Sequence, residues 1–364
     1  NIVVVFLGDG AIETGVAYES INFAATKKLP IIFACENNHY SVYSNLEVRQ
    51  PVGRTIAEFA KGCGINSVRV NGNDCTEVYD VSKILIEQAR ENIPSLIEME
   101  THRLREHCGP NYDDDLKYRC EEELYEWEAL DPLHLIKEKE NIEEDKLSIR
   151  RELDELTEIF RAAEQSESAN PISHSNIVFD NEVTYEQNGE DTDRILSYGE
   201  AIKEAHVQGL KRNKKSYVMG LGVTDPKSIF DTTSGLEKAY GPERVFDVPL
   251  SENALTGIAI GSAIMGTKVV LTHQRFDFAL VSIDQIVNQA AKWHYMFNGK
   301  MSVPIVIRMI VGRGWGQGPQ HSQSLHAWMA HIPGLKVVMP TSAYDAKGLM
   351  NAAFEDNNPV IFIE

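Results

Sequence analysis

Short apolar runs alternate with longer amphipathic segments through the first hundred residues of the chain. Four runs rich in β-branched and other apolar residues predict strands, at residues 2–7, 30–35, 67–70 and 95–100. Apolar residues at helical spacing follow Gly10 and recur over 76–90. Strands that alternate with helices indicate a parallel sheet with right-handed crossovers. Because the run at 2–7 has no polar alternation, we expect it to be a fully buried parallel strand.

The same alternation returns in the second half of the chain. Apolar runs predict further strands at residues 217–220, 268–272, 304–310 and 359–363. Helical spacing predicts a helix over 199–209, a helix rich in small residues that starts at Glu252, and a long helix over 277–298. The small residues let a second helix approach closely, either at an interface or inside one domain.

A different pattern separates the two halves. A helical stretch starts near Asp131, and its apolar stripe predicts a helix packed on a core or on a neighbour: Leu147, Ile149, Leu153, Leu156, Ile159 and Phe160. Residues 166–193 are rich in Ser, Asn, Asp and Glu, which is typical of an exposed linker. We therefore expect an α/β protein with two doubly wound parallel-sheet domains joined by a helical, acidic linker. The predicted boundaries are 1–130, 131–194 and 195–364.

Composition narrows the class of protein. The 364 residues are 43% hydrophobic and 24% charged, typical of a soluble globular protein, and no apolar run is long enough for a transmembrane helix. The formal net charge of -19 argues against a nucleic-acid partner. Five cysteines without metal or disulfide spacing indicate reduced thiols in a cytoplasmic protein. The chain begins directly with a strand and ends inside another, so we expect a fragment truncated at both ends.

The chemistry-bearing residues of the first half gather between residues 8 and 40. Gly-Asp-Gly follows the first predicted strand, and Asn-Asn follows the second. Ligands of open α/β sheets bind at the carboxyl edge, so Asp9 and Asn38 should lie at neighbouring strand ends. Oxygen ligands beside a helix N-terminus suit a divalent cation and a diphosphate. The alternative is a tight strand-to-helix turn that merely contains Gly-Asp-Gly.

This stretch resembles the thiamine diphosphate signature. The text Gly-Asp-Gly-Ala-x-Glu-x-Gly and Glu-Asn-Asn-x-Tyr is similar to the α subunit of the E1 components of 2-oxo acid dehydrogenases. The resemblance implies that Asp9, Asn38 and the backbone carbonyl of Tyr40 hold Mg²⁺. It also implies that the cofactor contacts the following residues of the signature: Gly8, Asp9, Gly10, Ala11, Asn38 and Tyr40.

A loop after the strand at 95–100 carries two histidines and two arginines, which are plausible phosphate and acid–base groups. The alternative is a polar surface loop. The E1 α resemblance assigns cofactor binding to Arg103 and an active-site role to His107. Cys108 stands where the family often has a Ser that is phosphorylated in some members, so that regulation is not carried over.

The second half resembles the E1 β subunit. The matching text includes Pro-x-Ser-Glu, Asp-Gln-x-x-Asn-x-Ala-Ala-Lys, Gln-His-Ser-Gln-Ser and Pro-Gly-Leu-Lys-Val-Val. The resemblance implies that Glu252 binds the pyrimidine nitrogen of the cofactor, that Phe278 stacks on the pyrimidine, and that His321 acts near the substrate carboxylate. From the residues alone, the favoured interpretation of Glu252 is an acid at a helix N-terminus, and that of Phe278 is an ordinary core aromatic. Leu221 stands at a position where the family often has an acid of a proton relay.

Together the two resemblances imply a fused E1 enzyme that depends on thiamine diphosphate and Mg²⁺. It would decarboxylate a 2-oxo acid such as pyruvate or a branched-chain analogue. The acyl group would then pass to a lipoyl-bearing E2 acyltransferase, and a homodimer is expected. The alternatives are a transketolase-like or acyloin-forming carboligase, and a non-catalytic assembly or regulatory module.

Overall fold

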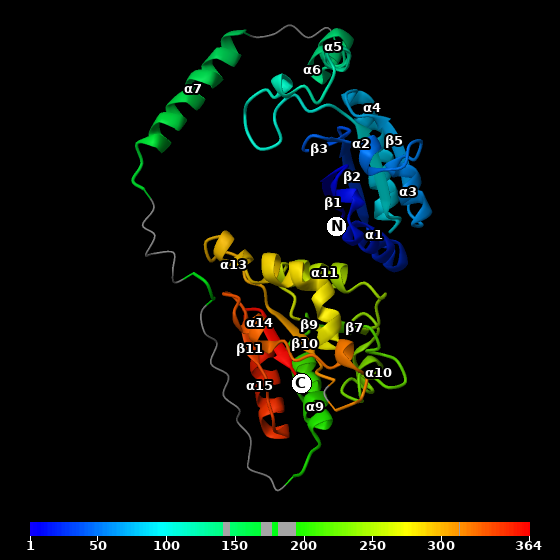
Figure 1. Cartoon of the computed structure of the whole chain (residues 1–364), viewed down its shortest axis with the longest axis vertical. Coiled ribbons are helices and arrows are strands. Elements are labelled where there is room, and N and C mark those ends of the chain that lie inside the picture. Colours follow the sequence, from blue (N-terminus) through cyan, green and yellow to red (C-terminus); the bar gives the residue numbers. More distant parts are fainter. Residues whose placement is uncertain (141–145, 169–176, 181–193, 313) are drawn as a thin grey trace. The chain divides into compact units, whose positions relative to one another are not determined.

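The structure, a computed structural model, describes residues 1–140, 146–168, 177–180, 194–312 and 314–364 (Figure 1). The chain divides into two compact units, Asn1–Ser168 and Ala169–Glu364. Each unit is built on a parallel sheet, so the predicted α/β fold class is confirmed. The finer division at residues 130 and 194 remains a prediction. No helix in the described part of the chain is long and apolar enough to cross a membrane.

The first unit contains a four-stranded sheet in the order β1-β2-β6-β5, and all its pairs are parallel. The strands are β1 (Val3–Gly8), β2 (Ile31–Asn37), β5 (Asn66–Asn71) and β6 (Ser95–Glu100). Helices α1 (Gly15–Lys27) and α3 (Ile56–Gly62) share one apolar cluster with the sheet, and α4 (Cys75–Arg90) shares another. Successive residues of β2 point to opposite faces of the sheet: Phe33 lies in the cluster with α1 and α3, and Ile32 lies in the cluster with α4. Helices therefore cover both faces.

The expectation that the run at 2–7 is fully buried is wrong. β1 forms the expected parallel strand, but it is an edge strand whose one partner in the described sheet is β2. Val3, Val4 and Phe6 are 53%, 45% and 70% exposed. A continuous apolar run predicts a strand, but whether neighbours cover its faces depends on tertiary structure.

Shorter elements complete the first unit. Strand β3 (Tyr40–Ser41) pairs antiparallel with β4 (Ser44–Asn45), and helix α2 (Leu46–Arg49) follows at once. A loop after β6 contains the 3₁₀ turn η2 (Asp114–Leu116) and leads to helices α5 (Glu121–Ala129), α6 (Pro132–Glu140) and α7 (Lys146–Glu164).

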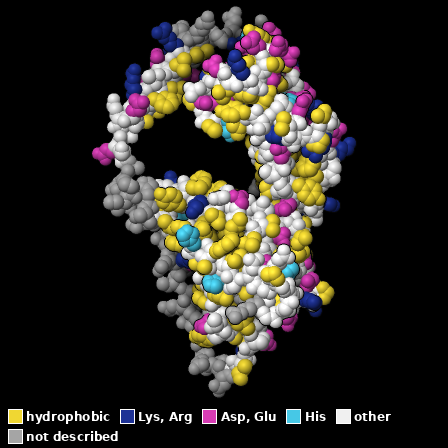
Figure 2. Space-filling view, viewed as in Figure 1, with side chains coloured by type: hydrophobic (Ala, Val, Ile, Leu, Met, Phe, Trp, Pro, Cys, Tyr) yellow, Lys and Arg dark blue, Asp and Glu magenta, His cyan; other side chains and the backbone are white. Residues whose placement is uncertain are grey.

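The apolar stripe of α7 does not pack on a core among the described residues. Figure 2 shows hydrophobic side chains along this helix, and five of the stripe residues are between 47% and 70% exposed: Ile149, Leu153, Leu156, Ile159 and Phe160. The helix is confirmed, but its expected packing partner is not found in the described part of the chain. The side chain of Leu147 and most of the expected linker at 166–193 lie outside the described residues.

The second unit contains a six-stranded sheet in the order β11-β12-β10-β9-β7-β8, again with parallel pairs. Its strands are β7 (Tyr217–Gly220), β8 (Val245–Phe246), β9 (Val269–His273), β10 (Ile305–Met309), β11 (Lys336–Val338) and β12 (Val360–Ile363). Helices α9 (Tyr198–Arg212) and α15 (Ala343–Glu355) pack together on one face. Helix α11 (Glu252–Ile264) lies on the other face (Figure 1). Short helices α10 (Leu236–Tyr240) and α14 (His326–Ala330) fill the connections.

The prediction of one regular helix over 277–298 is wrong. The segment breaks into α12 (Phe276–Ala279), the 3₁₀ turn η3 (Leu280–Ser282), the π-helix η4 (Gln285–Ala290) and α13 (Trp293–Met296). Helix α11 packs against η4, and a Cβ added to Gly257 would lie 3.0 Å from Oε1 of Gln285. The small residue at 257 therefore serves close packing inside the unit, whereas Gly261 faces open space.

Candidate active site

The register of β1 and β2 brings the two halves of the signature to one edge of the first sheet. Gly8 pairs with Glu36, so Asp9 and the Asn-Asn pair follow directly on neighbouring strands. The side chain of Asp9 is buried, and Asn38 is half-buried. Gly10 approaches the β3 segment so closely that an added Cβ would lie 2.8 Å from Oγ of Ser41.

The two neighbouring asparagines have different environments. Asn37 is 1% exposed, donates from Nδ2 to Glu98 at 2.9 Å, and accepts from the backbone N–H of His39 at 3.1 Å. Asn38 accepts from the backbone N–H of Tyr40 at 3.0 Å. Asn37 is thus committed to the core, and Asn38 is the asparagine at the open edge of the sheet.

Tyr40 links this edge to the following helices. Its hydroxyl donates to Glu123 at 2.8 Å, and burial together with that carboxylate raises its pKa to about 12. The ring also packs edge-on against Tyr118 at a centroid distance of 5.2 Å. The side chain is therefore fixed in the neutral form, and its backbone lies in β3 beside the strand ends.

The loop after β6 is tied to the same region by its arginines. Arg103 donates to the backbone oxygen of Val42 at 2.6 Å and to the hydroxyl of Tyr118 at 3.2 Å. Arg119, 7% exposed, donates to Asp113 at 2.7 Å. The Nε atoms of both arginines are buried without a hydrogen-bond partner among the described residues.

The two histidines of this loop differ. Burial and the nearby cations Arg119 and Arg103 lower the pKa of His102 to about 4, and its ring stacks on Trp127 at 5.1 Å. His107, the predicted catalytic residue, is exposed in a turn. No hydrogen bond or ring contact joins His107 to the other predicted site residues in the described part of the chain.

The first unit has oxygen ligands that suit a cation and a hydrogen-bond donor that suits a diphosphate. A buried carboxylate at Asp9 and an amide oxygen at Asn38 are hard ligands of the kind that Mg²⁺ takes together with phosphate oxygens. The buried Nε–H of Arg103 has no hydrogen-bond partner among the described residues and could donate to an anion. Within the described residues no three of His, Cys, Asp and Glu converge.

A residue that sequence reasoning missed completes this edge. Arg49, at the end of α2, forms ion pairs with both Asp9 and Glu13. Its sequence position, in a short polar stretch after the Asn-Asn motif, carries no pattern that would single it out.

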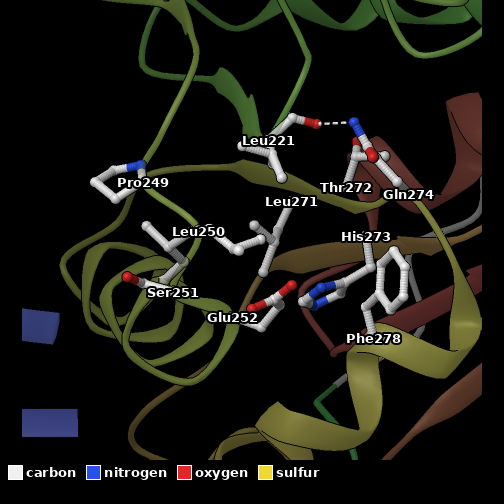
Figure 3. Close-up of a pocket in the computed structure, with 12 residues that line it drawn as sticks. Leu221, Pro249, Leu250, Ser251, Glu252, Leu271, Thr272, His273, Gln274 and Phe278 are labelled. Atoms are coloured by element: carbon white, nitrogen blue, oxygen red, sulfur yellow. Dashed lines mark hydrogen bonds between the residues drawn. The ribbon is translucent and has the colours of Figure 1, made fainter. Parts of the chain in front are cut away.

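The second unit has a pocket at the carboxyl ends of β7 and β9 (Figure 3). Glu252, the first residue of α11, and Phe278, on α12, both line it. The cavity volume is about 20 Å³, which is room for one water molecule. The remaining lining comes from the ends of the strands and from the α11 entry: Gly220, Leu221, Pro249, Leu250, Ser251, Leu255, Leu271, Thr272, His273 and Gln274.

His273 was not predicted, although it lies in the same pocket as Glu252 and Phe278 (Figure 3). Its imidazole is buried, which lowers its pKa to about 4, and Nε2 lies 3.4 Å from the hydroxyl oxygen of Thr256. That hydroxyl donates to the backbone oxygen of Glu252 at 2.8 Å. The only sequence signal was a polar residue at the end of an apolar strand.

His321 contacts Phe278, one of the residues that line the pocket. Their rings meet edge to face at 5.5 Å with an interplanar angle of 85°. The His321 backbone approaches Gly312 so closely that any side chain there would collide with its carbonyl oxygen. The structure thus brings together Glu252, Phe278 and His321 in the second unit, and Asp9, Asn38, Tyr40 and Arg103 in the first.

Comparison with known proteins matches both units. Residues 1–171 match the family described as dehydrogenase E1 component, and residues 195–364 match the pyrimidine-binding domain of transketolase. The β subunit of the pyruvate dehydrogenase E1 component is 44% identical over 169 residues in Rhizobium meliloti and in Caenorhabditis elegans. These matches cover 46% of this chain and 37% and 48% of the relatives.

A solved structure supports the same fold. A transketolase of Pichia stipitis, in complex with sedoheptulose 7-phosphate, has a TM-score of 0.64 at 17% sequence identity. The match covers 100% of this chain and 56% of the transketolase. The chain therefore spans about half the length of the proteins it matches. The chain thus carries a dehydrogenase E1 component match in its first half and a transketolase-type pyrimidine-binding match in its second, and its second half is similar to pyruvate dehydrogenase E1 β subunits.

Proposed function

We propose that the protein decarboxylates a small 2-oxo acid, pyruvate or a branched-chain analogue, with thiamine diphosphate and Mg²⁺. The acyl group then passes to a lipoyl group on an E2 acyltransferase partner. One observation carries the proposal: Glu252 and Phe278, identified separately in the sequence, line one pocket at the carboxyl edge of the second sheet. Assembly as a homodimer in the cytoplasm belongs to the proposal, and the five free cysteines agree with a reducing compartment.

The proposed roles in the first unit concern binding, except that of His107. Asp9, Asn38 and the Tyr40 carbonyl would hold the metal, and Arg103 would supply a cationic donor to the diphosphate. Gly8, Gly10 and Ala11 would let the backbone approach the same anion. His107 would act as an acid–base group at the substrate.

The proposed roles in the second unit concern the reaction. When bound, thiamine diphosphate supplies an electron sink for the carbanion that decarboxylation leaves. Glu252 would hold a proton at the pyrimidine nitrogen, Phe278 would fix the ring by stacking, and His321 would bind near the substrate carboxylate.

Binding and turnover of the full-length protein test this proposal. We expect saturable binding of thiamine diphosphate with Mg²⁺, and decarboxylation of a 2-oxo acid coupled to an artificial electron acceptor. No binding at millimolar cofactor would refute the enzymatic function. Carbon–carbon bond formation without any lipoyl acceptor would show a carboligase instead.

Replacing Glu252 by Gln separates catalysis from helix stabilisation. We expect the variant to bind the cofactor but to lose exchange of the C2 proton, because a neutral amide cannot hold and release the proton. Glu237→Gln is the matched control, since Glu237 is an exposed acid in the first turn of α10. Proton exchange at the wild-type rate in Glu252→Gln would show that Glu252 only stabilises the N-terminus of α11.

A further inference from the structure

The Arg49 side chain connects three separate segments of the first unit. It is 11% exposed and forms ion pairs with Oδ2 of Asp9 and, at 2.5 Å, with Oε1 of Glu13. Its Nε donates to the backbone oxygen of Ser44 at 3.0 Å. One guanidinium thus joins the end of β1, the turn that follows it, and β4.

These segments are the ones that carry the proposed metal ligands. Asp9 is itself a proposed ligand, and Ser44 pairs with Ser41 in the small ladder that begins at Tyr40. Glu13 is held from a second direction, because Gln50 donates to the same oxygen at 3.0 Å. Loss of the Arg49 side chain would therefore let the Asp9 side and the Tyr40 side of the edge move independently of each other.

The charge balance at Asp9 also depends on Arg49. The Asp9 side chain is 2% exposed, and a buried carboxylate is costly unless a cation or hydrogen-bond donors stabilise it. Arg49 binds Asp9 through Oδ2, and no hydrogen bond from another described residue takes Oδ1, which leaves that oxygen for a metal. Partners that hold a ligating carboxylate fix its direction, and their loss weakens metal affinity by about 10–100-fold.

We infer that Arg49 is a positioning residue for the metal and diphosphate. It holds Asp9 by one carboxylate oxygen, so that the other oxygen faces the cation. It also keeps the distance between the Tyr40 loop and Asp9 constant. The planar fork of a guanidinium can bind both carboxylates and the Ser44 oxygen at once, whereas a lysine offers a single point of charge. The inference rests on the proposed function, since it concerns the same cofactor site.

Titration of Mn²⁺ at saturating thiamine diphosphate, followed by electron paramagnetic resonance, tests the inference on the full chain. We expect Arg49→Gln to bind Mn²⁺ about 10–100-fold more weakly than the wild type. Arg49→Lys should recover part of that loss, because it restores the charge but not the fork. The control is Arg90→Gln on α4, where an exposed arginine pairs with Glu87, and its Mn²⁺ affinity should equal that of the wild type.

Circular dichroism of each variant distinguishes weaker binding from unfolding. A folded Arg49→Gln with wild-type Mn²⁺ affinity would overturn the inference, and so would wild-type affinity in Arg49→Lys if the glutamine variant fails to fold. Absence of Mn²⁺ and cofactor binding in the wild type would instead refute the proposed function, and the inference with it.

Discussion

Replacing Glu98 by Gln would test how the core fixes the Asn-Asn motif. Glu98 lies on β6, is 1% exposed, and accepts from Nδ2 of Asn37 at 2.9 Å and from the backbone N–H of Ala57 at 2.8 Å. Both partners are donors, so an amide with a single acceptor cannot satisfy them both. Rotating the Asn37 amide does not help, because its Oδ1 already accepts from His39. At least one buried donor is left unsatisfied in every arrangement.

The expected cost follows from these contacts. A hydrogen bond to a charged group contributes about 1.5–3 kcal/mol, and an unsatisfied buried donor costs about 1–3 kcal/mol. Arg69, 3.8 Å from Glu98 and 42% exposed, adds little. We expect Glu98→Gln to lower the free energy of unfolding of the first unit by about 2–4 kcal/mol, or its melting temperature by about 4–16 °C.

Two measurements check this prediction. Urea unfolding gives the loss of stability, and hydrogen–deuterium exchange of peptides from β2 shows whether the loss is centred at Asn37. Glu87→Gln is the control, because Glu87 is exposed and pairs with Arg90 three residues away, so its removal should cost about 0–0.5 kcal/mol. Equal stability of Glu98→Gln and the wild type would refute the reasoning from donor and acceptor counts.

Two further predictions concern the second unit. Arg308 is fully buried and bonded to Glu364 and Thr232, so Arg308→Met should cost about 3–5 kcal/mol in urea unfolding, and adding Glu364→Leu should recover most of it. Arg308→Met with the stability of the wild type would contradict this. The pKa of His273 falls from 6.5 to about 4 on folding, so stability is full above pH 6.5 and is lost towards pH 4. His273→Phe should flatten that part of the urea-midpoint profile, and an unchanged slope would contradict the assignment.

The sequence determined the elements that depend on local pattern. The strand at 95–100 and the strand at 217–220 have the predicted bounds, because each is a short segment with apolar residues that polar or turn-forming residues delimit. The alternation of strand and helix was also enough for the parallel sheets. Register then follows, and it brings Asp9 and Asn38 to neighbouring strand ends as predicted.

The sequence did not determine what lies against each element. The apolar run of β1 predicts a strand, but β1 lies at the edge of the described sheet and its Phe6 is exposed. The spacing over 277–298 predicts a helix, yet contact with α11 accompanies a π-helical stretch at Gln285–Ala290. Periodicity records which side chains share a face, whereas burial and helix regularity depend on the partner that packs there.

The same distinction applies to the candidate site. Glu252 and Asp9 stand in motifs whose order and spacing can be recognised along the chain. Arg49 and His273 stand in no motif, and only the tertiary structure places one on Asp9 and the other in the pocket of Glu252. A lone charged or titratable residue acquires its role from the groups it meets in space, and those contacts join residues far apart in sequence. The motifs could therefore be recognised in the sequence, whereas the residues that contact them could be identified only in the tertiary structure.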